Sequence, residues 1–162
     1  MTPPGPRNAV TGQAVIDASV ALKLFVPEEL SAQAEALFEQ LGRPEPVNLY
    51  VPGFFFIECA NVFRKWVRQF GYPEKDAGRN LNDLMSLGLG VIPTQVLAPE
   101  ALKLALHFRI TAYDASCAAA ASLAGAPFIT ADKRLANSIN SSKLPKGTKS
   151  AIEVIWLGEM EA

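Results

Sequence analysis

Short apolar runs alternate along this chain with segments of helical periodicity, and this alternation restricts the fold more than any other feature. Strands that alternate with helices are typical of a parallel sheet covered by helices on both faces. We therefore predict an α/β fold, a three-layer α/β/α sandwich with a mostly parallel central sheet. The predicted strands are residues 14–17, 47–52, 89–94, 126–130 and 151–157.

Helical spacing of apolar residues and stop signals such as glycine define the segments between these strands. The predicted helical segments are residues 18–26, 28–42, 53–71, 73–88, 99–109 and 112–125. A chain of 162 residues suits a single core. The predicted organisation is a flexible leader over 1–12, one domain over 13–157 and a tail over 158–162.

Composition narrows the setting in which the protein works. No apolar run approaches the length of a membrane span, which is about 20 residues, and the first residues lack the apolar core of a signal peptide. Cys59 and Cys117 lie in apolar helical patterns and are interpreted as buried thiols. These features predict a cytoplasmic protein without membrane association. A net charge of −1 does not indicate binding to nucleic acid by charge alone, but it leaves a nucleic-acid substrate possible.

Aspartates stand at the ends of two predicted strands. Asp17 follows the first strand and Asp132 follows the fourth, while Asp114 lies in the first turn of the helix before that fourth strand. Carboxyl ends of parallel strands share one edge of the sheet, where ligand sites form. Each acid also has a structural explanation, because Asp17 and Asp132 could cap helices and Thr111 with Asp114 fits a capping box.

Glu58 lies at the shoulder of an apolar arc on the helix over 53–71. Asn61, Lys65 and Arg68 continue a polar stripe from it at helical spacing. An ordinary boundary glutamate explains this position, and helical spacing alone does not reject that interpretation.

Three segments together resemble the PIN-domain nucleases, and most of all the ribonuclease toxins of VapBC-type toxin–antitoxin pairs. They are VIDASVALKLFVPEE at 15–29, ECANVFRKWV at 58–67 and TAYDASCAAAASLAGAPFITADKRLAN at 111–137. The resemblance implies a Rossmann-like sandwich with a metal-binding acidic edge. It implies catalytic and metal-binding roles for Asp17, Glu58, Asp114 and Asp132, and supporting roles for Ser19, Thr130, Asn61 and Asn137.

The same resemblance implies a Mg²⁺- or Mn²⁺-dependent endoribonuclease that acts on RNA. It also implies a cognate antitoxin protein and a homodimer, for which the helices at 28–42 and 53–88 are candidate contact surfaces. Basic residues could line the approach of RNA phosphates, although an exposed, solvated face is the more ordinary explanation for each group. These candidates are Arg64, Lys65, Arg68, Lys133 and Arg134.

Other functions remain as alternatives. The chain could be a stand-alone RNA-processing nuclease, or a PIN-like module that binds RNA or protein without cleavage. A receiver-type signalling domain is disfavoured because the third predicted strand ends without an aspartate. A haloacid-dehalogenase-type phosphatase is disfavoured because Ser19 stands where that reaction needs an acid, two residues after the first aspartate.

Overall fold

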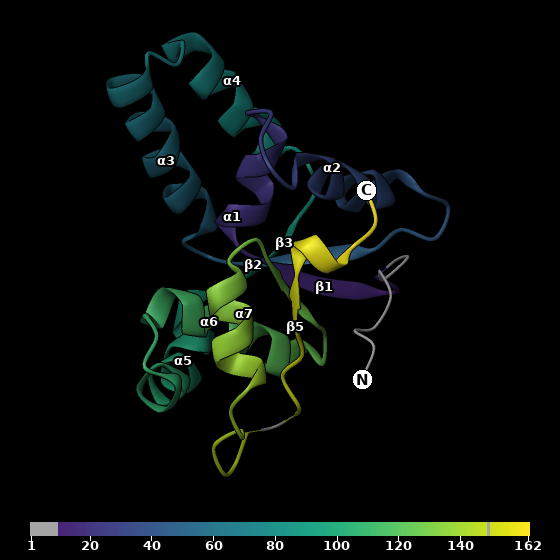
Figure 1. Ribbon diagram of the computed structural model, residues 1–162, viewed down its shortest axis with the longest axis vertical. Coiled ribbons are helices and arrows are strands. Elements are labelled where there is room, and N and C mark those ends of the chain that lie inside the picture. Colours follow the sequence, from purple (N-terminus) through teal and green to yellow (C-terminus); the bar gives the residue numbers. More distant parts are fainter. Residues whose placement is uncertain (1–9, 149) are drawn as a thin grey trace.

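A computed structural model describes residues 10–148 and 150–162 and has a parallel sheet at its centre (Figure 1). The sheet has five strands in the order β3–β2–β1–β4–β5, and every neighbouring pair is parallel. The predicted α/β fold with a parallel sheet is confirmed. The strands are β1 (Gln13–Ile16), β2 (Asn48–Pro52), β3 (Gly90–Ile92), β4 (Phe128–Thr130) and β5 (Val154–Trp156).

Helices cover both faces of this sheet, as the alternating pattern predicts. In Figure 1 the first four helices lie on one side of the sheet and the last three on the other, and α3 with α4 forms a hairpin that extends beyond the strands. No described helix is both long enough and apolar enough to cross a membrane. The helices are α1 (Ala18–Ala21), α2 (Ser31–Glu39), α3 (Phe55–Phe70), α4 (Glu74–Met85), α5 (Thr94–Phe108), α6 (Ala112–Ala124) and α7 (Lys133–Asn140).

Successive side chains of the central strands enter different cores, which is the geometric consequence of the strand pleat. Ile16 and Ile129 pack in the core beneath α1 to α4, whereas Val15 and Phe128 pack in the core beneath α5 to α7. All four side chains are fully buried. The two cores and the sheet between them make the three-layer sandwich.

The predicted start of the fifth helix is wrong. We expected this helix to begin at Pro99, but α5 begins at Thr94 and contains that proline. A proline lacks an amide hydrogen and therefore cannot donate the usual helical hydrogen bond to the carbonyl four residues earlier. Here that carbonyl belongs to Gln95 in the first turn, where a missing bond disturbs little of the helix.

Residues at both ends of the described chain pack against the domain. Val10 and Met160 are buried and belong to the core beneath α1 to α4, and Leu157–Glu159 form a 3₁₀ turn. Most of the predicted leader, residues 1–9, lies outside the described residues. The predicted tail after residue 157 therefore contains at least one residue of the core.

The strand order contains one reversal, which lies between β1 and β4. From β1 the chain builds outward through β2 to β3, and it then returns to add β4 and β5 on the other side of β1. In such sheets ligands bind in the crevice at the carboxyl ends of the strands beside this reversal. Asp17 follows β1 and Asp132 closely follows β4, so the reversal brings these two residues to one place.

Candidate active site

Asp17 is the centre of a hydrogen-bond network at the end of β1. It is the N-cap residue of α1, and its carboxylate accepts a hydrogen bond of 3.3 Å from the backbone N–H of Val20. The hydroxyl of Ser19 donates to Oδ1 of Asp17, and the hydroxyl of Thr130 donates to Oδ2 at 2.6 Å. The capping role predicted for this aspartate is confirmed, and the same carboxylate also links two strands.

Ser19 and Thr130 join the ends of β1 and β4 through further bonds to the backbone. The amide of Ala131 donates to the Ser19 hydroxyl oxygen at 3.0 Å, and the amide of Asp132 donates to the Thr130 hydroxyl oxygen at 3.1 Å. Thr130 is fully buried. These bonds hold Asp17 in a fixed orientation at the point where the strand order reverses.

The environment of Asp17 favours its neutral form. The pKa of this carboxyl group is raised from 3.8 to about 6, with burial as the largest cause and the negative charge of Asp114 as a smaller one. The bonds from Ser19, Thr130 and Val20 act in the opposite direction, because they stabilise the ionised form. Burial outweighs these bonds, so the carboxylate would gain from a nearby positive charge.

Glu58 contributes to the same electrostatic cluster from the first turn of α3. Although the residue as a whole is exposed, partial burial of its carboxyl group raises the pKa, and the charges of Asp17 and Asp114 raise it further. The helix is anchored by Phe55, Cys59 and Phe63, which are buried. This anchoring directs the shoulder of α3 toward the acidic edge.

Asp114 and Asp132 lie at the starts of the two helices that flank β4. The pKa of Asp114 is raised by burial and by the charge of Asp132, while a hydrogen bond with Thr111 lowers it. The Thr111 hydroxyl accepts the Asp114 amide at 3.1 Å, as the capping box predicts. Oδ1 of Asp132 caps α7 by accepting bonds from the amides of Arg134 and Leu135 at 2.9 and 3.1 Å.

Capping and electrostatic coupling therefore coexist in these acids. The four predicted residues are connected electrostatically, because Asp114 raises the pKa of Asp17, Asp17 and Asp114 raise that of Glu58, and Asp132 raises that of Asp114. None of the four takes part in an ion pair with another described residue. The edge of the sheet thus concentrates negative charge that no basic side chain of the described residues neutralises at contact distance.

The chemistry of these donors fits a hard divalent cation, because all of them are carboxylate or hydroxyl oxygens. Within the described residues, however, no three acidic, histidine or cysteine side chains are close enough together to hold an ion as they stand. Oδ2 of Asp132 and the carboxylate of Glu58 make no described hydrogen bond. Oδ2 of Asp132 can therefore bind an ion while Oδ1 keeps the cap of α7, and the Glu58 side chain can turn toward an ion without loss of a hydrogen bond.

The predicted supporting asparagines lie on exposed helix surfaces. Asn61 accepts a hydrogen bond of 3.1 Å from the Nε of Arg64, one turn further along α3. Asn137 is exposed on α7, one turn after Lys133. Neither has a described side-chain bond to the four acids, so their supporting roles stay predictions.

The predicted basic residues divide between two separate surfaces. Arg64 and Arg68 line a groove between α3 and α4, whereas Arg134 lines a groove that contains Asp114 and Asp132. Lys133 holds its ammonium group 4.4 Å from the centre of the Trp156 ring, which restrains it by a cation–π contact. Lys65 is exposed on α3.

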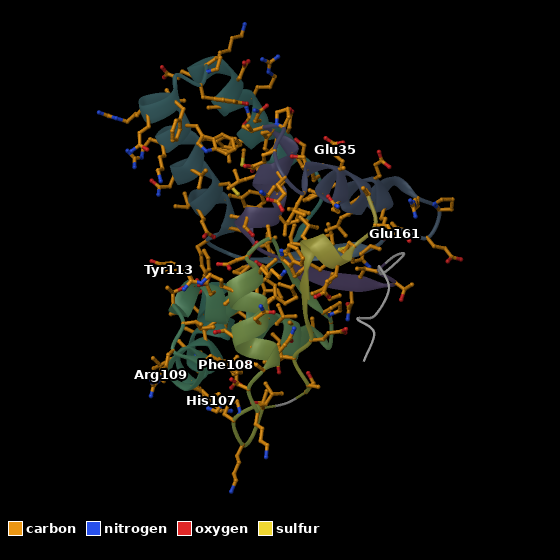
Figure 2. The ribbon with its side chains drawn as sticks, viewed as in Figure 1. Glu35, His107, Phe108, Arg109, Tyr113 and Glu161 are labelled. Atoms are coloured by element: carbon orange, nitrogen blue, oxygen red, sulfur yellow. The ribbon has the colours of Figure 1, made fainter. Side chains whose placement is uncertain are left out.

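Arg109 was not among the predicted site residues, yet it lines the same groove as Asp114 and Asp132. This residue ends α5 in a left-handed conformation, with a φ of 56°. Figure 2 shows Arg109 at the end of α5 and Tyr113 at the start of α6, on one side of the molecule. Glycine usually occupies a left-handed position at the end of a helix. The signal in the sequence was therefore an arginine, in place of a glycine, at the end of this helix.

The fold and the site define an α/β protein with an acidic edge at the reversal point of a parallel sheet. The model of the PIN-domain family matches residues 14–138, which are most of the chain. The chain therefore belongs to the PIN-domain family. A relative named Ribonuclease VapC3, from Pyrobaculum aerophilum, is 33% identical over 124 residues, which cover 75% of this chain and 91% of the relative.

Solved structures agree with this fold. The crystal structure of PAE2754 from Pyrobaculum aerophilum has a TM-score of 0.60 at 24% identity and covers 79% of this chain and 86% of that one. The structure of VapBC-1 from nontypeable Haemophilus influenzae has a TM-score of 0.58 at 16% identity and covers 90% and 98%. A toxin–antitoxin complex from Klebsiella pneumoniae has a TM-score of 0.53 at 17% identity and covers 75% and 88%.

Proposed function

We propose that this chain is a metal-dependent endoribonuclease and the toxin of a toxin–antitoxin pair. Membership of the PIN-domain family supports this proposal, as does a relative that covers most of the chain and is named a ribonuclease. The observation that carries it is the electrostatic coupling of four acids from distant parts of the chain at one edge of the sheet. These acids are Asp17, Glu58, Asp114 and Asp132.

The proposed cofactor is Mg²⁺ or Mn²⁺, held by these four carboxylates. Such an ion, when bound, lowers the pKa of water and stabilises negative charge on a phosphodiester. Ser19 and Thr130 hold the Asp17 carboxylate toward the site by donating hydrogen bonds to its two oxygens. Because these hydroxyls are themselves fixed by backbone amides, the orientation of Asp17 is set before the substrate arrives.

A cleavage assay with a matched control tests the proposal. Purified protein is incubated with a labelled single-stranded RNA, with and without Mg²⁺, and products are separated by electrophoresis. Asp17→Asn is expected to abolish the Mg²⁺-dependent cleavage, because one carboxylate charge is lost at the centre of the cluster. Asp83→Asn makes the same chemical change on the exposed surface of α4 and should leave the rate unchanged. Cleavage by Asp17→Asn at the wild-type rate would refute the assignment.

The proposed partners are RNA, a cognate antitoxin and a second copy of the chain, in the cytoplasm. The groove between α3 and α4, lined by residues including Arg64, Arg68 and Leu81, is a surface on which an antitoxin could lie. α3 also exposes the apolar side chains of Ile57 and Phe70, 74% and 73% of which are accessible. Expression of the chain alone is expected to arrest growth, and co-expression of the antitoxin to restore it.

A non-catalytic PIN-like module is a second candidate, and one observation favours it. Among the described residues, no three potential ligands are already placed around a common point. Titration calorimetry with Mn²⁺, followed by the cleavage assay, separates the two candidates. Metal binding without cleavage of varied RNAs would favour the binding module, and cleavage without growth arrest would favour a stand-alone RNA-processing nuclease.

A further inference from the structure

A groove extends from two of the acids toward the end of α5. Asp114 and Asp132 lie at the site, and the other lining residues come from the α5–α6 connection and from one face of α7. These other residues are Arg109, Ile110, Thr111, Arg134, Leu135 and Ser138. The groove therefore combines two guanidinium groups and two hydroxyl groups with a direct connection to the proposed site of cleavage.

The two arginines of this groove have charges that no described carboxylate neutralises. Arg109 and Arg134 are both exposed, and neither forms an ion pair with another described residue, although two aspartates line the same groove. Among the exposed arginines of the described residues, only Arg79 forms an ion pair, with Asp76. The groove thus presents donors that are available to an anionic ligand.

The backbone at Arg109 provides an independent observation. Three of the described helices end in a left-handed residue, and for α3 and α6 that residue is a glycine, Gly71 or Gly125. At the end of α5 it is Arg109, although a glycine adopts this conformation at less cost. Leu30 is the other described non-glycine residue with a positive φ, and its side chain packs against the core. The side chain of Arg109 makes no described contact of that kind.

We infer that this groove binds phosphates of the RNA strand that flank the cleaved bond, with Arg109 and Arg134 as the phosphate ligands. The inference rests on the proposed function, because it takes RNA as the substrate. Guanidinium groups bind phosphate oxygens through charge-assisted hydrogen bonds. The hydroxyls of Thr111 and Ser138 are exposed in the same groove and add neutral donors. The bound strand therefore leaves the acids between α6 and α7, on the side opposite the groove of α3 and α4.

Arg109→Gly separates binding from folding, because glycine is the residue that the backbone conformation favours. The variant should melt at the same temperature as the parent protein or at a higher one. Affinity for a fluorescein-labelled, unstructured 12-nucleotide RNA is measured by anisotropy over a range of KCl concentrations. The measurement uses the full chain with Asp17→Asn, so that the RNA is not cut. Arg43→Gly is the matched control, because Arg43 is exposed and precedes β2, at the opposite edge of the sheet.

The expected result for Arg109→Gly is an affinity about tenfold weaker. The slope of log affinity against log salt concentration should be about 0.7 shallower for each phosphate of a single strand that the variant no longer binds. Arg134→Gln should give a similar loss, Arg109→Lys should recover most of the affinity, and Arg43→Gly should change neither quantity. Unchanged affinity and salt dependence in Arg109→Gly would overturn the inference, as would absence of RNA binding by the parent protein.

Failure of the inference and failure of the proposed function give different results. Wild-type cleavage with RNA binding that is indifferent to Arg109 refutes the groove and leaves the nuclease in place. RNA binding that depends on Arg109, in a protein that never cleaves, supports the groove and refutes the nuclease. If Arg109→Gly weakens only the binding of a partner protein, the groove is a protein-binding surface and the inference is wrong.

Discussion

Replacement of Asp17 by asparagine tests the electrostatic description of the site without any assumption about substrate. Asparagine has nearly the same shape, and its amide oxygen can still accept the bond from the Val20 amide. It cannot ionise. The variant therefore removes the charge that burial and Asp114 make costly and keeps most of the local packing.

The size of the effect follows from the pKa. In the folded protein the pKa of Asp17 is about 6, whereas its ordinary value is 3.8. The folded state thus holds this proton more tightly than the unfolded state, so stability is greatest below the ordinary value and falls as the pH rises through about 6. Since one pH unit corresponds to about 1.4 kcal/mol, the wild type should lose about 2 to 3 kcal/mol between pH 4 and pH 7.5 through this group.

Urea unfolding monitored by circular dichroism from pH 4 to pH 8, in EDTA, measures this loss. Asp17→Asn should show a shallower decline, so its stability relative to the wild type should rise by about 2 to 3 kcal/mol across that range. Asp83→Asn, on the exposed surface of α4, serves as the control for a change of net charge. Glu58 and Asp114 also have raised pKa values. The contribution of Asp114 remains in both proteins, whereas that of Glu58 is smaller in the variant, because the charge of Asp17 is one cause of its raised pKa.

Equal pH dependence in the wild type and in Asp17→Asn would refute the reasoning. That result would mean that the carboxyl group of Asp17 has the same pKa in the folded and unfolded states. A difference that grows toward low pH would contradict the direction of the shift. Either result would remove the electrostatic argument for a cation at this edge of the sheet.

Three further results are expected from other parts of the structure. Thr130→Val removes the hydroxyl that donates a hydrogen bond to Asp17, and should lower the stability by about 1 to 2 kcal/mol at neutral pH. It should also raise the pKa of that aspartate, and the same urea-unfolding series measures both effects. Gly158→Ala should destabilise the fold by about 1 to 3 kcal/mol in thermal melts, because its new Cβ would lie 2.3 Å from the Trp156 ring. Burial raises the pKa of the Cys117 thiol well above its ordinary value, so a thiol reagent should react with it only after unfolding; fast labelling of the native protein would contradict this.

Local sequence patterns predicted the fold class and the positions of all five strands. This succeeded because the apolar run of a buried strand and the periodicity of a helix are properties of neighbouring residues. The same patterns placed Asp17 and Asp132 at the ends of strands, and they predicted the capping by Thr111. The start of α5 was missed because a proline inside a first turn has the same local signal as a proline that begins a helix.

The order of the strands was decided only by the tertiary structure. Val15 pairs with Phe128 across more than a hundred residues, and no local pattern specifies that β1 lies between β2 and β4. This neighbourhood creates the bond from Thr130 to Asp17 and brings Asp114 close enough to influence the pKa of that aspartate.

Arg109 illustrates the same division between sequence and structure. The sequence shows an arginine at a helix end, and only the packing of α5 against α6, beside the start of α7, places it in a groove with Asp114 and Asp132. Local conformation depends on short-range sterics and hydrogen bonds that the sequence encodes residue by residue. A site depends on which distant segments become neighbours, and that choice is made by the burial of both faces of the sheet as a whole.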